Sequence, residues 1–242
     1  MLRENTLSRP VDGLSRGDSD LVEKKYESLQ IYLASSVNDF KAVNQLWQKV
    51  YVEELSWLSS VPSQNKHDVL CEDVYHPHST YILAKIGDSV IGTLRLVFDS
   101  DSAGLPVEQF FPLDILKDDK GSTIEAHRLM LSPEYRKTRL SEAPFGISAS
   151  LLKAGFHYCF QKKVSRIFID AFVDTPTTPI KTFKSIGFKE IGCPFVDSEL
   201  SESSLSVAMV IDVMQLLSTT YSGKSKLLRY IFSPDSAIRF PT

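Results

Sequence analysis

The sequence contains Tyr81-Ile-Leu-Ala-Lys-Ile86, a short turn, and then Val90-Ile-Gly-Thr-Leu-Arg-Leu-Val-Phe98. Both runs are rich in β-branched and other apolar residues, as strands are. The turn between them, Gly87-Asp88-Ser89, opens with a glycine, which can adopt a positive φ angle. This pattern predicts a β-hairpin.

Outward from the hairpin, the apolar spacing predicts alternating strands and helices. Strands are expected at residues 29–34, 124–131, 164–172, from 188 and at 205–213. Helices are expected from about 38 to 57, at 143–160 and at 176–186, the last ending at Gly187. This order predicts an α/β (α+β) fold in which a mixed sheet carries helices on both faces.

Composition describes an ordinary globular protein. The chain has 242 residues, of which 43% are hydrophobic and 24% charged, and a formal net charge of -3. This length can bury a full core without a disulfide or a metal ion, and the charge argues against nucleic-acid binding. We expect a mobile extension at 1–28, one catalytic domain at 29–217 and a second extension at 218–242.

Features that direct proteins to other compartments are missing. The three cysteines form no C-x-x-C pair, which fits a reducing cytoplasm. Arg3, Glu4 and Arg9 interrupt the stretch where a signal peptide would be apolar. The longest apolar tract, residues 205–217, is too short to span a bilayer. We predict a cytoplasmic protein without a transmembrane segment and leave peripheral membrane contact open.

Charge is distributed unevenly along the chain. Residues 53–125 hold thirteen Asp or Glu against five Lys or Arg, whereas residues 128–166 hold eight Lys or Arg against two acids. The basic segment is either a solvated surface or a landing site for an anionic group. A coenzyme A pyrophosphate and the acidic surface of a carrier protein would both suit the second alternative.

Several common motifs are absent, including G-x-G-x-x-G, the P-loop, G-x-S-x-G and H-E-x-x-H. His76-Pro-His78 has no second ligand pair nearby in sequence, so we predict no metal site and no permanently bound cofactor. The segment Glu125-Ala-His-Arg128 is more informative, because charged residues inside a strand are usually paired. In a regular strand Glu125 and His127 share one face and Arg128 takes the other, unless a bulge intervenes.

An ordered series of short motifs is similar to one enzyme group. The series runs through Val50-Tyr-Val-Glu-Glu-Leu-Ser-Trp57, Asp73-Val-Tyr-His76, Gly92-Thr-Leu-Arg95-Leu96, Phe110-Phe111 and Glu125-Ala-His-Arg128-Leu129. Over residues 29–212 it resembles acyl-homoserine-lactone synthases, long-chain N-acyl amino acid synthases and exosortase-associated acyltransferases, which belong to the GNAT-like N-acyltransferases. The resemblance implies a GNAT-like, mostly antiparallel sheet of about six or seven strands.

The resemblance also implies the site residues. Glu125 is expected at the reaction centre as general base, with Arg128 and Arg95 beside it as orienting residues. The expected substrate-binding residues are Trp47, Tyr51, Trp57, Asp73, His76, Phe98, Phe110 and Phe111. The expected donor-binding residues are Leu129, Leu131, Arg136, Lys137, Arg139 and Gly146.

Four positions depart from the family pattern. Trp47 replaces an arginine of the lactone synthases and His76 replaces an aspartate, which favours an N-acyl amino acid product over a lactone. The pyrophosphate loop keeps Arg139 but lacks its first glycine, which favours an acyl carrier protein over coenzyme A as donor. Phe183 stands where many members have a tyrosine that acts as an acid. A thiol leaving group needs little help from such an acid, so the reaction tolerates its loss.

We therefore expect an N-acyltransferase that moves a long-chain acyl group from a carrier-protein or coenzyme A thioester to the amine of an amino acid or a similar small molecule. Aromatic side chains such as Trp57 and Phe110 are expected to line an apolar acyl site, although aromatics at such spacing also fit a core. Two alternatives stay open: a short-chain acetyltransferase, and a non-catalytic member that binds an acyl thioester or a partner protein.

Overall fold

A computed structural model describes residues 28–58, 73–113, 116, 122–173, 178–197, 205–222, 225–234 and 238–239. Residues 1–27 lie outside it, so the predicted N-terminal extension stays a prediction. No helix in these described ranges is both long enough and apolar enough to cross a bilayer.

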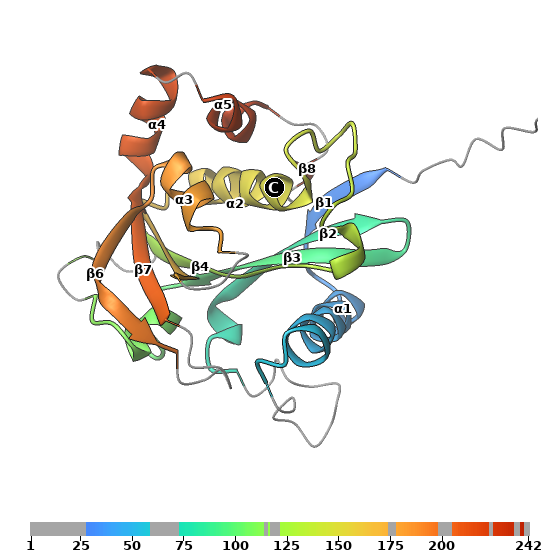
Figure 1. The fold of residues 1–242 in the computed structure, drawn as a ribbon, viewed down its shortest axis with the longest axis horizontal. Helices are drawn as coiled ribbons and strands as arrows, with labels where there is room; N and C mark the ends of the chain where they lie inside the picture. Colours follow the sequence, from blue (N-terminus) through green and yellow to red (C-terminus); the bar gives the residue numbers. More distant parts are fainter. Residues whose placement is uncertain are drawn as a thin grey trace, which may run out of the picture.

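The centre of the fold is one eight-stranded sheet in the order β6-β7-β5-β4-β3-β2-β1-β8 (Figure 1). The strands are β1 (Leu29–Leu33), β2 (Ser79–Ile86), β3 (Ser89–Phe98), β4 (Thr123–Leu131), β5 (Arg166–Phe172), β6 (Lys189–Val196), β7 (Leu205–Asp212) and the two-residue β8 (Ile238–Arg239). Only the β4–β5 and β1–β8 pairs are parallel. The predicted hairpin is β2–β3, and the mostly antiparallel sheet with helices on both faces is confirmed.

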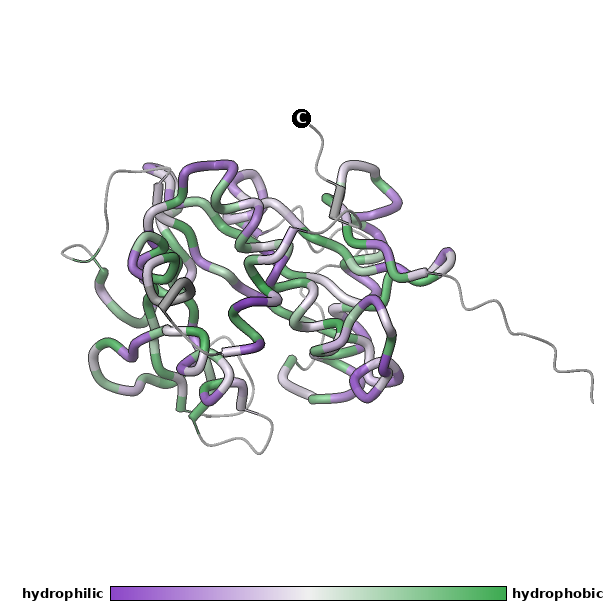
Figure 2. The backbone as a smooth tube through the Cα atoms, turned by 90° about the horizontal axis from the view of Figure 1, so that it is seen from above, coloured by the Kyte–Doolittle hydropathy of each residue, from purple (hydrophilic) through white to green (hydrophobic). Residues whose placement is uncertain are grey.

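Helices cover the two faces of the sheet unequally (Figure 1). One face carries α1 (Val37–Trp47), whose apolar side packs against β3 and β4. The other face carries α2 (Ile147–Gln161) and α3 (Ile180–Ile186), with α4 (Val213–Ser222) and α5 (Lys226–Phe232) farther out. Figure 2 shows hydrophobic and hydrophilic residues interspersed along the backbone of these elements. We call the two faces the α1 face and the α2 face.

The first helix is less regular than predicted. A capping box between Ser36 and Asp39 starts it, but α-helical geometry ends at Trp47 and a π-helical turn, η1 (Gln48–Glu54), continues the chain. Short π-helical segments are rare and concentrate at functional sites. This one is followed by Trp57, whose backbone N–H donates to the Tyr51 carbonyl.

The C-terminal segment packs on the fold. Residue 217, where we expected the catalytic domain to end, lies inside α4. Farther on, α5 packs against α2, and β8 pairs with β1 at the edge of the sheet. The described parts of residues 218–242 therefore contribute to the core, with Leu228 and Ile231 buried there.

Strand β4 has two irregularities that shape the centre of the sheet. Its parallel pairing with β5 covers only residues 123–125, although all residues of both strands are described. Its pairing with β3 shifts register opposite Leu94, where Arg128 has a φ of 51°. A non-glycine residue in this left-handed region costs roughly 1–3 kcal/mol and is a recurrent feature of functional sites. We refer to this position as the β4 bulge.

Candidate active site

Two arginines meet one aspartate on the α1 face. Arg95 of β3 donates to both carboxylate oxygens of Asp73, at 2.6 and 3.0 Å, and its Nε donates to the Ser79 hydroxyl at 2.8 Å. Arg128 of β4 donates to Asp73 Oδ2 at 3.1 Å. Because Arg95 is 0% exposed and its guanidinium bonds both Asp73 and Ser79, it holds the Asp73 carboxylate in place, which in turn contacts Arg128.

The Arg128 side chain reaches this group because of the β4 bulge. In the absence of a bulge it would point to the α2 face; instead its guanidinium lies 3.6 Å from the centre of the Trp47 ring, on the α1 face. Glu125, His127 and Arg128 therefore share one face. Burial alone would raise the pKa of Asp73, but the hydrogen bonds from Arg95 and the charges of Arg95 and Arg128 lower it to about 2.

A chain of aromatic contacts connects the first helix to β5. Tyr51 lies between Trp47 and Trp57, with ring centroids 6.1 and 5.3 Å apart, and Trp57 lies 4.6 Å from Phe172. The π-helical turn and the residues after it thus cover the α1 face beside the gap between β4 and β5. Arg128 contacts Trp47 at one end of this chain of rings, and the predicted substrate-binding role of Trp47, Tyr51 and Trp57 stays a prediction.

Two carboxylates and an imidazole meet at the gap. Ligand atoms of Glu125, His127 and Asp170 all lie within 4.8 Å of one another, and we call these three residues the carboxylate cluster. Glu125 is 1% exposed and accepts a hydrogen bond from the Val107 N–H at 2.8 Å. In the described part of the chain, this is also the one group of such side chains close enough to hold a metal ion, which the sequence did not predict.

Burial dominates the electrostatics of the carboxylate cluster. It raises the pKa of Glu125 well above its ordinary value, and the neighbouring Asp170 adds to this effect, while the Val107 N–H and Arg95 oppose it. Burial, followed by the charge of Asp197, raises the pKa of Asp170 to about 6. Burial and the nearby arginines lower the pKa of His127, so its ring is neutral at physiological pH. The Nδ1 atom of this ring is buried without a hydrogen-bond partner.

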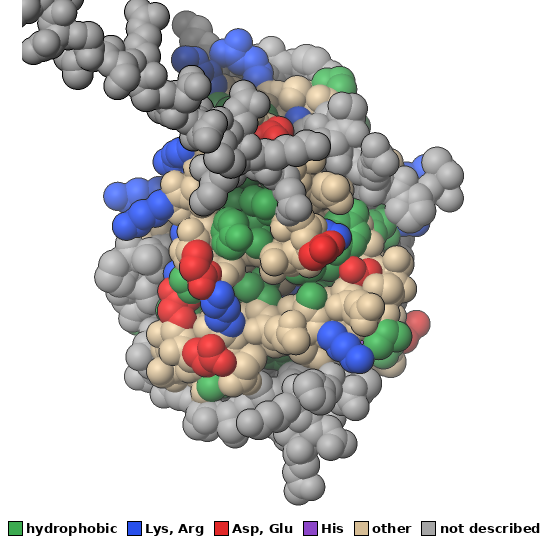
Figure 3. Space-filling view, turned by 90° about the vertical axis from the view of Figure 1, so that its right-hand side faces the viewer, with side chains coloured by type: hydrophobic (Ala, Val, Ile, Leu, Met, Phe, Trp, Pro, Cys, Tyr) green, Lys and Arg blue, Asp and Glu red, His purple; other side chains and the backbone are tan. Residues whose placement is uncertain are grey.

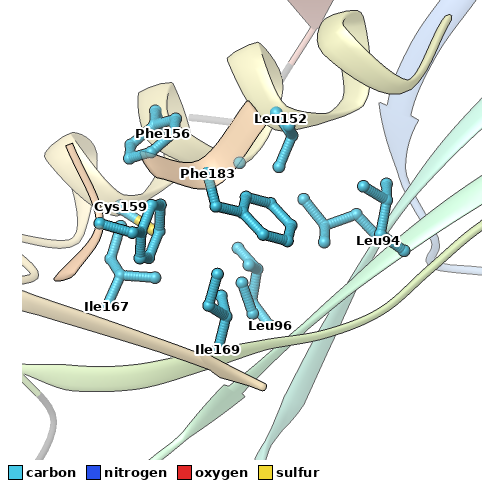
Figure 4. A pocket seen from close by; sticks show the side chains of 12 residues that line it. Leu94, Leu96, Leu152, Phe156, Cys159, Ile167, Ile169 and Phe183 are labelled. Atoms are coloured by element: carbon cyan, nitrogen blue, oxygen red, sulfur yellow. The ribbon is translucent and has the colours of Figure 1, made fainter. Parts of the chain in front are cut away.

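An apolar pocket lies on the α2 face of the same strands (Figure 4). Twelve residues line it: eleven have apolar side chains, and the twelfth is Gly155. They come from β3, β4, β5, α2, α3 and the α3–β6 connection and include Leu96, Leu129, Leu152, Phe156, Ile169 and Phe183. The Phe183 ring lies in the middle of these side chains, so the position where the resemblance implies a tyrosine acid is part of an apolar wall.

None of the six aromatic candidates lines this pocket, and their predicted lining of an acyl site stays a prediction. Trp47, Tyr51 and Trp57 lie on the opposite face of the sheet. Phe98 packs against Tyr158 in the core, Phe110 stacks on Phe195 at 5.5 Å, and Phe111 packs over Gly192. Periodicity shows that these residues are buried and cannot show which cavity they border.

The predicted donor-binding residues do not form one group in the structure. Leu129 lines the apolar pocket and Leu131 is buried in the core. Arg136 forms a bidentate ion pair with Glu54 at 2.5 Å. Lys137 and Arg139 are exposed, and Arg139 approaches Gly146, whose φ of 89° starts α2. In Figure 3, acidic and basic side chains are interspersed on the face shown.

The predicted His76-Pro-His78 pair does not converge on one point. His76 Nδ1 lies 3.2 Å from the Tyr81 hydroxyl, and His78 Nε2 lies 2.8 Å from the Ser102 hydroxyl. His76 also packs edge-on against Phe40 at the margin of the Asp73 group. Its predicted role in substrate binding stays a prediction.

Asp170 is a candidate that the motif comparison missed. A signal was present: Arg166-Ile-Phe-Ile-Asp-Ala-Phe172 is a buried strand with one acid in its middle. Such an acid normally has a functional or structural reason. The strand contains no motif, however, and only the tertiary structure brings Asp170 to Glu125.

Comparisons with known proteins agree with this geometry. The sequence profile described as "N-acyl amino acid synthase FeeM" matches residues 42–201. BjaI, a coenzyme A-dependent acyl-homoserine lactone synthase solved with SAM and isopentyl-CoA, is 18% identical, with a TM-score of 0.63 over 88% of this chain and 94% of that one. FeeM, an N-acyl amino acid synthase from uncultured soil microbes, is 15% identical, with a TM-score of 0.57 over 79% of this chain and 93% of that one.

A third similar structure is the ribosomal-protein-alanine N-acetyltransferase from Brucella melitensis. It is 14% identical, with a TM-score of 0.52 over 74% of this chain and 98% of that one. No curated protein matches the chain in sequence. At these identities the structural likeness establishes the GNAT-like fold, and the profile match, which spans more than half of the chain, establishes the family. The chain belongs to the FeeM N-acyl amino acid synthase family and is an N-acyltransferase.

Proposed function

We propose that the protein transfers a long acyl chain from a carrier-protein or coenzyme A thioester to the amine of an amino acid. One observation carries the proposal: β4 and β5 place the carboxylate cluster on the α1 face and border the apolar pocket on the α2 face, beside the gap between the two strands. An acceptor on one face and an acyl chain on the other would meet in that gap.

The acceptor side supplies a base and a cation. An amine attacks a carbonyl carbon only after losing its proton, and Glu125 is a carboxylate placed to help remove it. Arg128 retains one contact with Asp73 and stacks on Trp47, with 15% of its side chain exposed. A guanidinium in this position suits the carboxylate of an amino acid.

The β4 bulge supports stabilisation of the oxyanion. Backbone N–H groups after Glu125 have no strand partner on the β5 side, so those beside the gap can donate to a tetrahedral oxyanion. The leaving thiol needs little help, because the ordinary pKa of a thiol is about 8.5. The apolar Phe183 is therefore compatible with turnover.

The apolar pocket suits a long acyl chain better than an acetyl group. Leu152→Trp fills this pocket from α2 and should shift the preference towards shorter chains, by at least about tenfold in the ratio of kcat/KM values. Competition between acyl thioesters of increasing chain length measures the ratio. Met214→Trp, at a position 71% exposed on α4, is the matched control and should leave the ratio unchanged. An unaltered preference in Leu152→Trp would place the acyl chain elsewhere.

The start of α2 suits the anionic part of the donor. Gly146 is the N-cap of α2, where the first-turn N–H groups lack partners within the helix, and the exposed Lys137 and Arg139 carry positive charge on the preceding segment. Reversing both charges (Lys137→Glu with Arg139→Glu) should raise the KM for the donor about tenfold and leave the KM for the amine unchanged. Steady-state kinetics at low salt test this. An equal change in both KM values would contradict a donor-specific role.

Mass spectrometry of lipid extracts tests the proposal in cells. Cells that express the protein should contain an N-acyl species that cells expressing Glu125→Ala lack. The mass of that species would identify both substrates. A long-chain N-acyl amino acid supports the proposal, whereas N-acetylated amines alone would favour the short-chain alternative.

A further inference from the structure

Asp170 occupies the α1 face of β5. Its neighbours Ile167 and Ile169 line the apolar pocket, so the alternation of a strand directs Asp170 to the opposite face. Phe172, two residues further on, contacts Trp57 on that face. Asp170 therefore borders the gap between β4 and β5 from the side opposite Glu125.

The two buried carboxylates lie close to each other. Their oxygens are within 4.8 Å of each other, and in the described part of the chain neither forms an ion pair. Glu125 accepts from the Val107 N–H, and Asp170 is stabilised by its own backbone. Two buried carboxylates at this distance cannot both be ionised at low cost, so they need a shared proton or a bound positive charge.

The surroundings of the carboxylate cluster favour the binding of a positively charged ligand. Burial raises the pKa of Glu125 well above its ordinary value and that of Asp170 to about 6. The neutral His127 adds a buried Nδ1 atom without a hydrogen-bond partner. Two adjacent buried carboxylates and an imidazole nitrogen without a hydrogen-bond partner offer the acceptor atoms that a primary ammonium group needs.

From this geometry we infer that Asp170 is a second catalytic carboxylate, which binds the ammonium group of the acceptor together with Glu125. The inference rests on the proposed function and deepens it, since it selects acceptors that arrive as ammonium ions. One proton passes from the ammonium to the carboxylate pair, and the nitrogen lone pair then forms the C–N bond. The C–S bond breaks, the thiolate takes the second nitrogen proton, and the pair releases its proton to solvent.

Arg128 completes the selection. It lies on the same face, beside the carboxylate cluster, and its charge suits an acceptor carboxylate. An acceptor that binds both the carboxylate cluster and Arg128 carries an ammonium group and a carboxylate close together, as an α-amino acid does. A 2-hydroxy acid of the same side chain keeps the carboxylate and lacks the ammonium, which makes it the discriminating ligand.

The test begins with the wild-type protein, palmitoyl-CoA or palmitoylated carrier protein, and a mixture of the proteinogenic amino acids. The amino acid that gives most product is then used for kinetics, and its 2-hydroxy analogue is used as an inhibitor. Asp170→Asn should lower kcat/KM at least about 100-fold, raise the KM for the amino acid and leave the KM for the donor unchanged. Asp170→Glu, which keeps the charge, should retain part of the activity.

Binding measurements and a control variant complete the test. Wild type should bind the amino acid more tightly than the hydroxy acid, and Asp170→Asn should lose this discrimination. Asp88→Asn, in the exposed β2–β3 turn, should match wild type throughout. Unchanged kcat/KM and discrimination in Asp170→Asn would overturn the inference, as would activity that a chelator removes and a divalent cation restores. If wild type yields no N-acyl product at all, the proposed function itself fails.

Discussion

Asp73→Asn should destabilise the protein by about 3–5 kcal/mol at neutral pH, because it leaves the buried charge of Arg95 without its partner. Arg95 is 0% exposed, and both of its terminal nitrogens donate to Asp73. The asparagine keeps the shape and one acceptor oxygen but loses the charge that balances two arginines. Urea denaturation measures the change in the free energy of unfolding.

The pH dependence of this effect has a definite sign. The pKa of Asp73 is about 2 in the folded protein, below its ordinary value of 3.8. The ionised carboxylate therefore stabilises the fold fully above pH 3.8, and this stabilisation is lost as the pH falls through about 2. The difference between wild type and Asp73→Asn should shrink by about 2.5 kcal/mol over that window. Glu190→Gln, which removes an exposed ion pair with Lys184, is the control and should cost at most about 1 kcal/mol.

Glu125→Gln should lower kcat/KM by about 10²–10⁴-fold, because a glutamine cannot accept the proton of the attacking amine. Its stability should move in the opposite direction. The pKa of Glu125 is raised well above its ordinary value, so the wild-type protein loses stability as the pH rises above that ordinary value. The glutamine variant has no such loss and should unfold at a higher temperature at neutral pH.

This combination separates catalysis from folding. Glu190→Gln is the same substitution on the surface of β6 and should change neither activity nor melting temperature appreciably. A Glu125→Gln variant that is fully active would remove Glu125 from the mechanism. A variant that is inactive and also less stable would assign it a structural role instead.

The sheet could be predicted from the sequence because its strands have simple local signals. The β2–β3 hairpin has two apolar runs and a turn that contains glycine, and the order of strands and helices then restricts the topology. The side on which Arg128 lies could not be predicted, because the bulge depends on how β3 and β4 pair and leaves no signal in the sequence. The π-helical end of the first helix is a similar case, since its apolar spacing fits an ordinary helix.

The candidate site was only partly predictable. Motif spacing indicated Glu125, Arg128, Arg95 and Asp73, which the fold brings to one face. The carboxylate of Asp170 and the apolar pocket arise from contacts between segments far apart in the chain, such as β3 with α2 and β4 with β5. Aromatic residues were poor guides, because burial in a core and exposure to a pocket require the same side chains.

We propose that acyl transfer from a thioester to an amine takes place at the gap between β4 and β5. Its most direct test is mass spectrometry of reactions that contain purified protein, acyl-CoA or acyl carrier protein, and a panel of amino acids, run in parallel with Glu125→Gln. We predict a long-chain N-acyl amino acid with the wild-type protein and a product yield lower by orders of magnitude with the variant. No N-acyl product from any donor and acceptor, or equal yields from the two proteins, would contradict the account.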